Sequence, residues 1–141
     1  MIKLTHEPIE SEALLQRAQT PEAGAVVMFL GVSRRMTRGR ETTELTYQAY
    51  EAMAAKELER LEAEARERWP LVECSIVHRL GIVPLGEASV AVSVASAHRR
   101  EAFDAGEWLI DTLKERVPIW KQEHWADGAT QWVHPVAGTD Q

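Results

Sequence analysis

Apolar residues recur along the chain with two different periods, which predict helices in some segments and strands in others. In Glu51–Trp69 and His98–Val117 an apolar residue follows at every third or fourth position, so each segment places one apolar stripe along a long helix. Pro70 and Pro118 come directly after these segments and end the helices. A shorter helix is predicted over Ile9–Ala18. The buried stripe of the second long helix is expected to contain Ala102, Phe103, Gly106, Ile110, Leu113 and Val117.

Other segments have the patterns of strands. The almost continuous apolar run Gly24–Ser33 is typical of a strand buried on both faces, and Thr43–Ala49 alternates as a half-buried strand does. We expect these two strands to form a hairpin around an arginine-rich loop. Hairpin-like pairs of strands with helices between them favour an α+β fold with a mostly antiparallel sheet. The remaining strands are predicted at Ile2–His6, Val72–Val83, Ser89–Ala95, Ile119–Trp125 and Thr130–Val133.

Length and composition fit one domain that covers residues 1–141. The chain is 45% hydrophobic and 27% charged, which excludes wholesale disorder. Its apolar runs are too short to cross a bilayer, and the first residues lack the pattern of a signal peptide, so we predict a cytoplasmic protein. Cys74 is the only cysteine, which excludes an internal disulfide and a thiolate metal cluster and predicts a buried core thiol.

The charge distribution points to a small anionic ligand. A net charge of −6 disfavours a general nucleic-acid binder, yet basic residues gather in Arg34–Arg40 and again at Arg99 and Arg100. In the first cluster, arginines at the tip of a loop often serve only solubility. Arg34 differs because it directly follows a predicted strand, which would hold it in place.

The segment Ser96–Arg100 joins a predicted strand to the second long helix. Ser96 or His98 is expected to cap this helix, whose first N–H groups attract an anion. The planar guanidinium of Arg99 suits a phosphate or carboxylate, and His98 can donate a hydrogen bond or move a proton. The alternative is a set of basic residues that face water.

Two lysines close to Pro118 are candidates for catalysis. Lys121 shares one face of a predicted strand with Glu123, where partial burial would lower the pKa of its amine and suit it to act as acid, base or nucleophile. Lys114 lies near the end of the second long helix, where the alternative to catalysis is an exposed pair with Asp111. The sequence contains no nucleotide-binding glycine motif, no serine-nucleophile motif and no histidine spacing typical of a metal site.

Several stretches, in order over residues 24–133, match one known family. They are Gly24–Gly31 followed by Arg34, Tyr47–Ala54, His78–Gly81 with Gly86 and Glu87, Ser96–Phe103, Asp111–Lys114 and Pro118–Glu123. On these stretches the sequence resembles the large, catalytic subunit of molybdopterin synthase.

The resemblance implies an α/β hammerhead fold and a sulfur-transfer reaction. The family inserts sulfur into cyclic pyranopterin monophosphate and so makes the dithiolene of molybdopterin. The sulfur comes from a small ubiquitin-like partner with a C-terminal Gly-Gly thiocarboxylate. The family forms a homodimer of large subunits with one small subunit at each end, and it needs no metal or separate cofactor for the transfer.

The resemblance also implies roles for individual residues. Lys114 matches the essential lysine of the family, and Lys121 matches its second active-site lysine. Lys121, Gln122 and Glu123 stand where the family usually has Lys-Lys-Glu, and all three are expected at the substrate.

Further matches concern the binding of the substrate. His98 and Arg99 match the pair that binds the pterin phosphate, and Arg34 matches a basic residue of the pocket. Where the family has a basic residue near its C-terminus, this chain offers His134.

Together these observations give one hypothesis and two alternatives. A basic hollow at the start of the second long helix, counting the residues of both copies in the dimer, is expected to hold a phosphorylated heterocycle beside the reactive amine of Lys114, assisted by Lys121. One alternative is a non-catalytic module that binds an anion or nucleotide. The other is a partner-binding subunit with Trp120, Trp125 and Trp132 as interface anchors.

Overall fold

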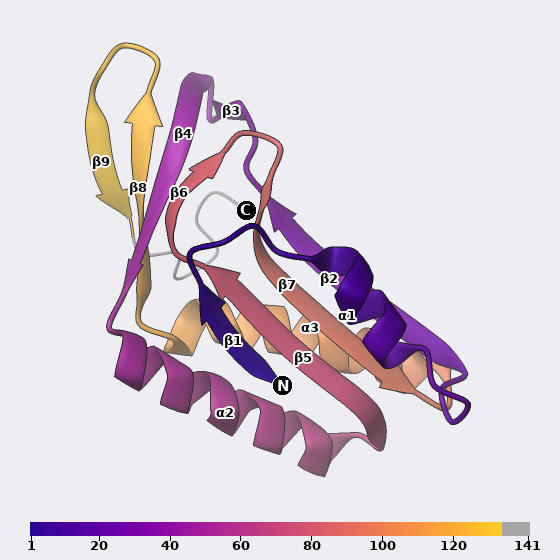
Figure 1. The fold of residues 1–141 in the computed structure, drawn as a ribbon. Helices are drawn as coiled ribbons and strands as arrows, with labels where there is room; N and C mark the ends of the chain where they lie inside the picture. Colours follow the sequence, from indigo (N-terminus) through magenta and orange to yellow (C-terminus); the bar gives the residue numbers. More distant parts are fainter. Residues whose placement is uncertain (134–141) are drawn as a thin grey trace.

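The first of two sheets has four strands in the order β1-β5-β7-β2 (Figure 1). The computed structural model describes residues 1–133. In this sheet β1 runs parallel to β5, whereas β5 and β2 both run antiparallel to β7 between them. The strands are β1 (Ile2–Thr5), β2 (Ala25–Val32), β5 (Leu71–Arg79) and β7 (Ala88–Ser96).

The second sheet is antiparallel and rises beyond one end of the first (Figure 1). Its order is β3-β4-β8-β9, and β6 pairs with β4 as well. After β5 the chain bends at Gly81, whose φ of +83° suits glycine, and enters this sheet as β6. The strands are β3 (Met36–Thr37), β4 (Arg40–Ala49), β6 (Gly81–Pro84), β8 (Ile119–Trp125) and β9 (Thr130–Val133).

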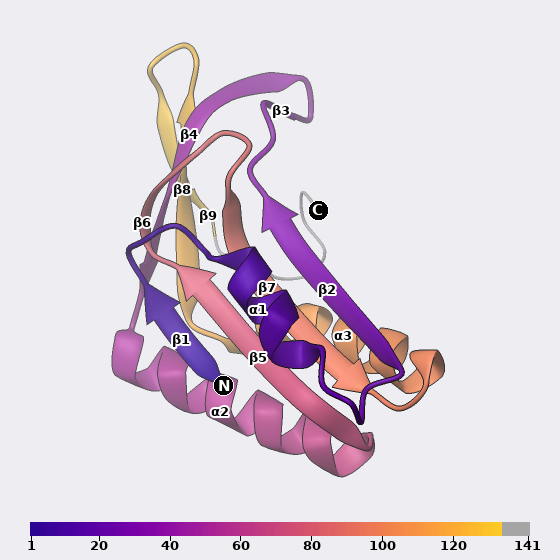
Figure 2. The same cartoon turned by 45° about the vertical axis from the view of Figure 1, so that its right-hand side comes forward.

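Helices cover both faces of the first sheet (Figure 2). The long helices α2 (Glu51–Arg68) and α3 (Arg99–Arg116) pack on one face, and α1 (Ser11–Ala18) packs on the other. The apolar stripes of α2 and α3 meet the inward side chains of β5 and β7, which forms the main core. Its fully buried members include Leu58, Leu61, Ile76, Val92, Val94 and Leu109.

The structure confirms the α+β class and both long helices, but two predictions about strands are wrong. No hairpin joins Gly24–Ser33 to Thr43–Ala49, because β2 pairs with β7 while β4 pairs with β6 and β8. The apolar run of β2 finds its partner in the equally apolar β7. Strand β2 is also not buried on both faces: it lies at the edge of the sheet, and its Phe29 is 37% exposed.

Two predictions about α3 also need correction. Phe103 is 61% exposed, because the buried stripe runs through Ala102, Ala105 and Leu109 and passes beside it. Neither Ser96 nor His98 caps the helix with its side chain. The Ser96 hydroxyl instead donates to the carbonyl oxygen of Pro70 at 3.0 Å.

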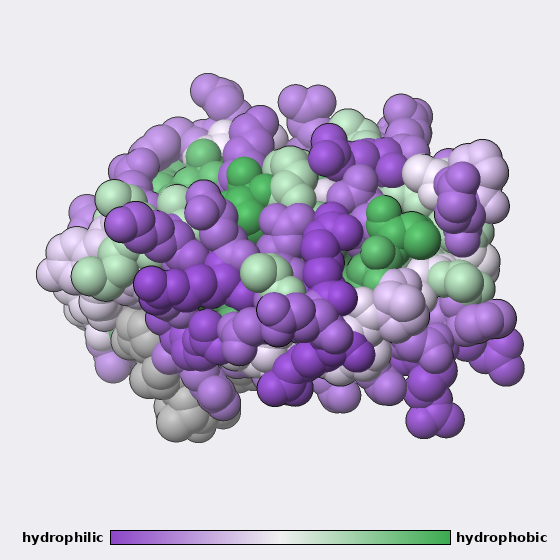
Figure 3. Space-filling model, turned by 90° about the horizontal axis from the view of Figure 1, so that it is seen from below, coloured by the Kyte–Doolittle hydropathy of each residue, from purple (hydrophilic) through white to green (hydrophobic). Residues whose placement is uncertain are grey.

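The face of the protein seen from below is mostly hydrophilic (Figure 3), and the one cysteine of the chain is buried. Hydrophilic residues predominate on the face seen from below, and apolar residues form small separate patches there (Figure 3). None of the helices within residues 1–133 combines the length and the apolar character that a membrane span requires. Cys74 is buried in the core as predicted, and burial raises the pKa of its thiol to about 11.

Candidate active site

A cavity of about 220 Å³ lies where the C-terminal end of α3 meets β2 and the second sheet. Its charged lining residues are Arg34, Lys114, Lys121 and Glu123. Three elements supply them: Arg34 follows the end of β2, Lys114 stands in the last turn of α3, and β8 carries the other two. The fold therefore brings together four predicted site residues that are far apart in the sequence.

An ion pair fixes the wall that β8 contributes. The strand alternates between buried and half-buried positions, which places Lys121 and Glu123 on its buried face as predicted. Lys121 Nζ lies 3.4 Å from Glu123 Oε1. The hydroxyl of Thr42 on β4 donates to the other carboxylate oxygen, Oε2, at 3.0 Å. No pattern in the sequence points to Thr42, because a threonine in an alternating strand gives no signal of its partner.

His78 also lines this cavity, although the sequence points to it only through the stretch His78–Gly81 that matches the family. Its side chain is buried, its Nδ1 lies 2.8 Å from the carbonyl oxygen of Arg79, and its ring meets Tyr47 edge-on at 5.1 Å between centroids. Burial, together with a smaller effect of the positive charge of Lys114, lowers the pKa of His78 to about 4. The imidazole is therefore neutral at pH 7. With Nδ1 as the donor to Arg79, Nε2 is left as an acceptor.

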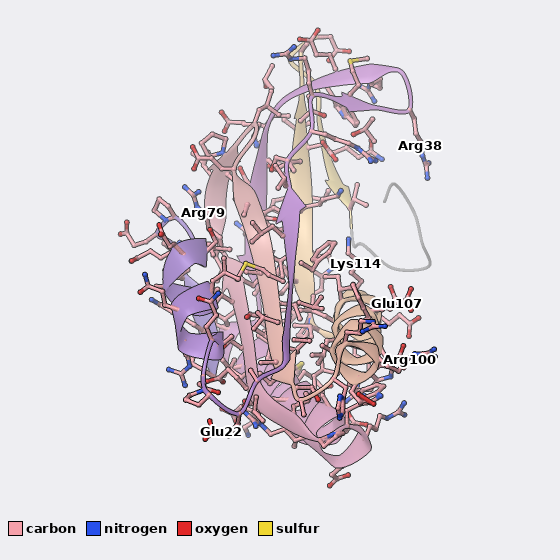
Figure 4. All side chains as sticks on the ribbon, turned by 90° about the vertical axis from the view of Figure 1, so that its right-hand side faces the viewer. Glu22, Arg38, Arg79, Arg100, Glu107 and Lys114 are labelled. Atoms are coloured by element: carbon pink, nitrogen blue, oxygen red, sulfur yellow. The ribbon has the colours of Figure 1, made fainter. Side chains whose placement is uncertain are left out.

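His98 and Arg99 lie at the other end of α3, away from the cavity with Lys114. They line a second, shallower cavity of about 580 Å³ at the N-terminal end of α3, together with Gly24 and Phe103. Fifteen helical positions separate Arg99 from Lys114, about 22 Å at 1.5 Å per residue. Figure 4 looks along α3, and in this view the labelled Lys114 lies on the side toward the second sheet, whereas the labelled Arg100 points away from it. Within one chain the two groups therefore lie in separate cavities, whereas the expected hollow counts the residues of both copies in a dimer.

The other predicted positions contribute less to the cavity. Gln122 points to the opposite face of β8 from Lys121 and is not among the cavity-lining residues. His134 lies outside the described residues. Among the expected interface anchors, Trp125 is buried beneath the guanidinium of Arg40, whereas Trp132 is 49% exposed. Within the described range, no three His, Cys, Asp or Glu side chains gather as metal ligands would.

Comparison with known proteins identifies the relatives of this chain. Residues 4–116 match the model of the MoaE protein family. The chain belongs to the MoaE family. It is 41% identical over 131 residues to the molybdopterin synthase catalytic subunit of Bacillus subtilis, a match that covers 93% of this chain and 83% of the relative.

Solved structures of MoaE relatives have the same fold. The chain is similar to the crystal structure of molybdopterin synthase from Staphylococcus aureus, with a TM-score of 0.87, 40% identity, and coverage of 92% of this chain and 94% of that one. A Helicobacter pylori structure, described as a complex of subunits 1 and 2 of molybdopterin-converting factor, gives a TM-score of 0.77 at 22% identity. It covers 98% of this chain and 92% of that chain. The last likeness concerns the fold alone.

Proposed function

We propose that this MoaE protein is the catalytic subunit of a molybdopterin synthase in the cytoplasm. It takes sulfur from the C-terminal Gly-Gly thiocarboxylate of a small ubiquitin-like partner and adds it to cyclic pyranopterin monophosphate, which makes the dithiolene. The observation that carries the proposal is the cavity at the end of α3, whose described wall contains Arg34, Lys114 and Lys121 together with the carboxylate of Glu123. Its cations suit anionic reactants in a protein that is acidic as a whole.

The cavity residues suit the chemistry of sulfur transfer. The thiocarboxylate sulfur bonds to a carbon of the pterin side chain and displaces an oxygen substituent of that carbon, which leaves as an oxygen anion and takes up a proton. Water then cleaves the bond between that sulfur and the acyl carbon of the tail, so the partner ends as a carboxylate. Each tail carries one sulfur, and a dithiolene consumes two tails. Both steps develop negative charge on oxygen, which the Lys114 ammonium stabilises or protonates, assisted by Lys121.

A second copy of the chain would complete the site. Strand β2 ends the first sheet, and no strand within residues 1–133 pairs with its outer edge. On this strand Phe29, Leu30 and Val32 are 37%, 37% and 52% exposed. An edge of this length with apolar side chains is suited to pair with another strand. These features support a homodimer that forms along β2.

Antiparallel pairing of two β2 edges would bring the two basic cavities together. The start of β2 lies beside the N-terminal end of α3, since Gly24 N–H donates to the Ser96 carbonyl oxygen at 2.9 Å. The end of β2 lines the cavity with Lys114. A twofold axis would set the start of one β2 against the end of the other. We therefore propose that His98 and Arg99 of one copy hold the substrate phosphate beside Lys114 of the other.

The proposal is tested by assembling the reaction. The purified protein is mixed with a thiocarboxylated small subunit and the pyranopterin, and the product is identified by its mass. We expect dithiolene product from the wild type, none from Lys114→Ala, and an unchanged yield from Lys56→Ala, whose lysine is exposed on α2 away from the cavity. Ligand binding without product would favour the anion-binding module, and complex formation without product would favour the partner-binding subunit.

A further inference from the structure

Among the described residues that line the cavity with Lys114, one is a carboxylate and three are cations. The cations of its described wall are Arg34, Lys114 and Lys121, and the carboxylate is that of Glu123. The other titratable side chains of the wall are Tyr47 and His78. A carboxylate in this place repels an anionic reactant unless a neighbouring cation neutralises it. A carboxylate is therefore compatible with an anionic reactant in this cavity only if the charge of Glu123 neutralises one particular cation.

Both oxygens of Glu123 have defined partners. Oε1 faces Lys121 Nζ at 3.4 Å, and Oε2 accepts the hydroxyl proton of Thr42 with an oxygen–oxygen distance of 3.0 Å. Thr42 is 1% exposed and Glu123 is 3% exposed, so water does not compete for this hydrogen bond. A carboxylate that is held at one oxygen has a fixed orientation for the other.

A β-bulge places Thr42 in this position. Regular pairing of β4 with β8 ends at Glu44, and the next pair joins Thr42 to Trp125. Thr43 is therefore the extra residue of the bulge. In a regular strand Thr42 would point to the same face as Glu44, away from Glu123. The bulge instead turns the Thr42 side chain inward and leaves Thr43 exposed.

We propose that Thr42 is a positioning residue for Lys121 and acts through Glu123. Its hydroxyl holds one carboxylate oxygen, so that the other stays directed at the Lys121 ammonium and keeps that ammonium at a fixed place in the cavity wall. This inference rests on the proposed function only in giving Lys121 a part in sulfur transfer. The contact itself is a property of the free protein.

The first test uses the sulfur-transfer assay. Thr42→Val keeps the shape of the side chain and removes the hydroxyl. We expect it to lower kcat about tenfold, the effect of losing one hydrogen bond to a charged group. Thr42→Ser keeps the hydroxyl and is expected to retain wild-type turnover. In the background of Glu123→Gln, Thr42→Val is expected to cause no further loss, because Thr42 acts only through that carboxylate.

Thr43 provides a matched control. It is the neighbouring residue with the same side chain, and its hydroxyl donates to the His124 carbonyl oxygen at 3.0 Å on the exposed face. Thr43→Val should leave kcat unchanged. An equal loss of kcat in Thr42→Val and Thr43→Val would overturn the proposal, since both would then reflect a general disturbance of β4. If Thr42→Val does not fold, Thr42→Ala removes the same hydroxyl and takes its place.

The second test needs no reaction. The chain has four lysines, Lys3, Lys56, Lys114 and Lys121, so selective ¹³C labelling of lysine gives four ε-methylene signals in an NMR spectrum. We expect Thr42→Val to shift the Lys121 signal in the same direction as Glu123→Gln does. The signals of Lys3 and Lys56, which are exposed, should not shift. An unmoved Lys121 signal would overturn the inference even if turnover falls. A wild type that makes no product would instead refute the proposed function, and the spectrum would still decide the role of Thr42.

Discussion

Lys121 and Glu123 stand two residues apart on the buried face of β8, and their charged atoms lie 3.4 Å apart. Their side chains are only 10% and 4% exposed, so the removal of Lys121 leaves the Glu123 carboxylate buried without the cation that lies 3.4 Å from it. We expect Lys121→Met to lower the free energy of unfolding by about 3 kcal/mol. Denaturant unfolding followed by circular dichroism measures this loss.

The double variant separates the ion pair from ordinary packing. Lys121→Met combined with Glu123→Gln removes both charges and should recover most of the lost stability. Lys56→Met on the surface of α2 should change it by less than about 0.5 kcal/mol. A double variant that is as unstable as the sum of the single variants would show that the two charges are not coupled.

The buried imidazole of His78 predicts a loss of stability in acid. Burial lowers the pKa of His78 to about 4 in the folded protein, whereas an unfolded histidine has a value near 6.5. Between these values the unfolded state binds a proton that the folded state does not, so stability is fully present above pH 6.5 and falls as the pH falls toward 4. The contribution of His78 to this loss is about 3 kcal/mol.

Replacement of His78 isolates its contribution from those of the carboxylates. His78→Gln does not titrate, so the difference in unfolding free energy between it and the wild type should vary with pH between about 6.5 and 4 and be constant above that window. Denaturant unfolding at a series of pH values gives this difference. A difference that is independent of pH throughout would mean that His78 is not buried as a neutral ring.

The periodicity of the sequence was sufficient for the helices and for the α+β class, because each apolar stripe is a local property of its segment. The pairing of strands was not predictable in the same way. Nothing in the segment Ala25–Val32 states that its partner is the distant β7 rather than the nearby β4, and the hairpin prediction failed for that reason. The prediction that Phe103 is buried was wrong because an apolar stripe on a helix is wide enough to include a residue that lies beside the core.

The candidate site was predictable in part. Alternation placed Lys121 and Glu123 on one buried face, and both line the cavity with Lys114. Thr42 was not predictable, because a β-bulge reverses the face to which its position in the alternation assigns it. The separation of Arg99 from Lys114 within one chain follows from the length of α3, so a hollow that contains both residues takes them from two copies.

The contact between Gly24 and the start of α3 makes a prediction about the fold at that end. A Cβ on Gly24 would lie 2.1 Å from the carbonyl oxygen of Ala97, which is backbone and cannot turn aside. We expect Gly24→Ala to destabilise the protein by about 2–3 kcal/mol. Gly106→Ala provides the control. Its new Cβ would lie 3.4 Å from Val27 Cγ1, an ordinary contact, and alanine favours the helix in which residue 106 stands, so this variant should be neutral or slightly stabilised. Equal melting temperatures for the two variants would contradict the close approach.

A site shared between two copies predicts that two inactive variants restore each other. If Lys114 of one chain works with Arg99 of the other, then a mixed dimer of Lys114→Ala and Arg99→Ala chains has one site with both residues intact and one site with neither. Random exchange makes about half of the dimers mixed, and each has half of its sites restored. The mixture should therefore reach about a quarter of wild-type activity.

The reverse arrangement gives a different result in the same experiment. If Lys114 and Arg99 of one chain served the same site, every site in the mixed dimer would lack one of them, and the mixture would show only the activity of its parents. The two chains are mixed in mild denaturant, refolded together and assayed for dithiolene product, with each variant treated alone as the control. Because α3 separates the two residues by about 22 Å in one chain, restored activity would require the second copy to bridge that distance.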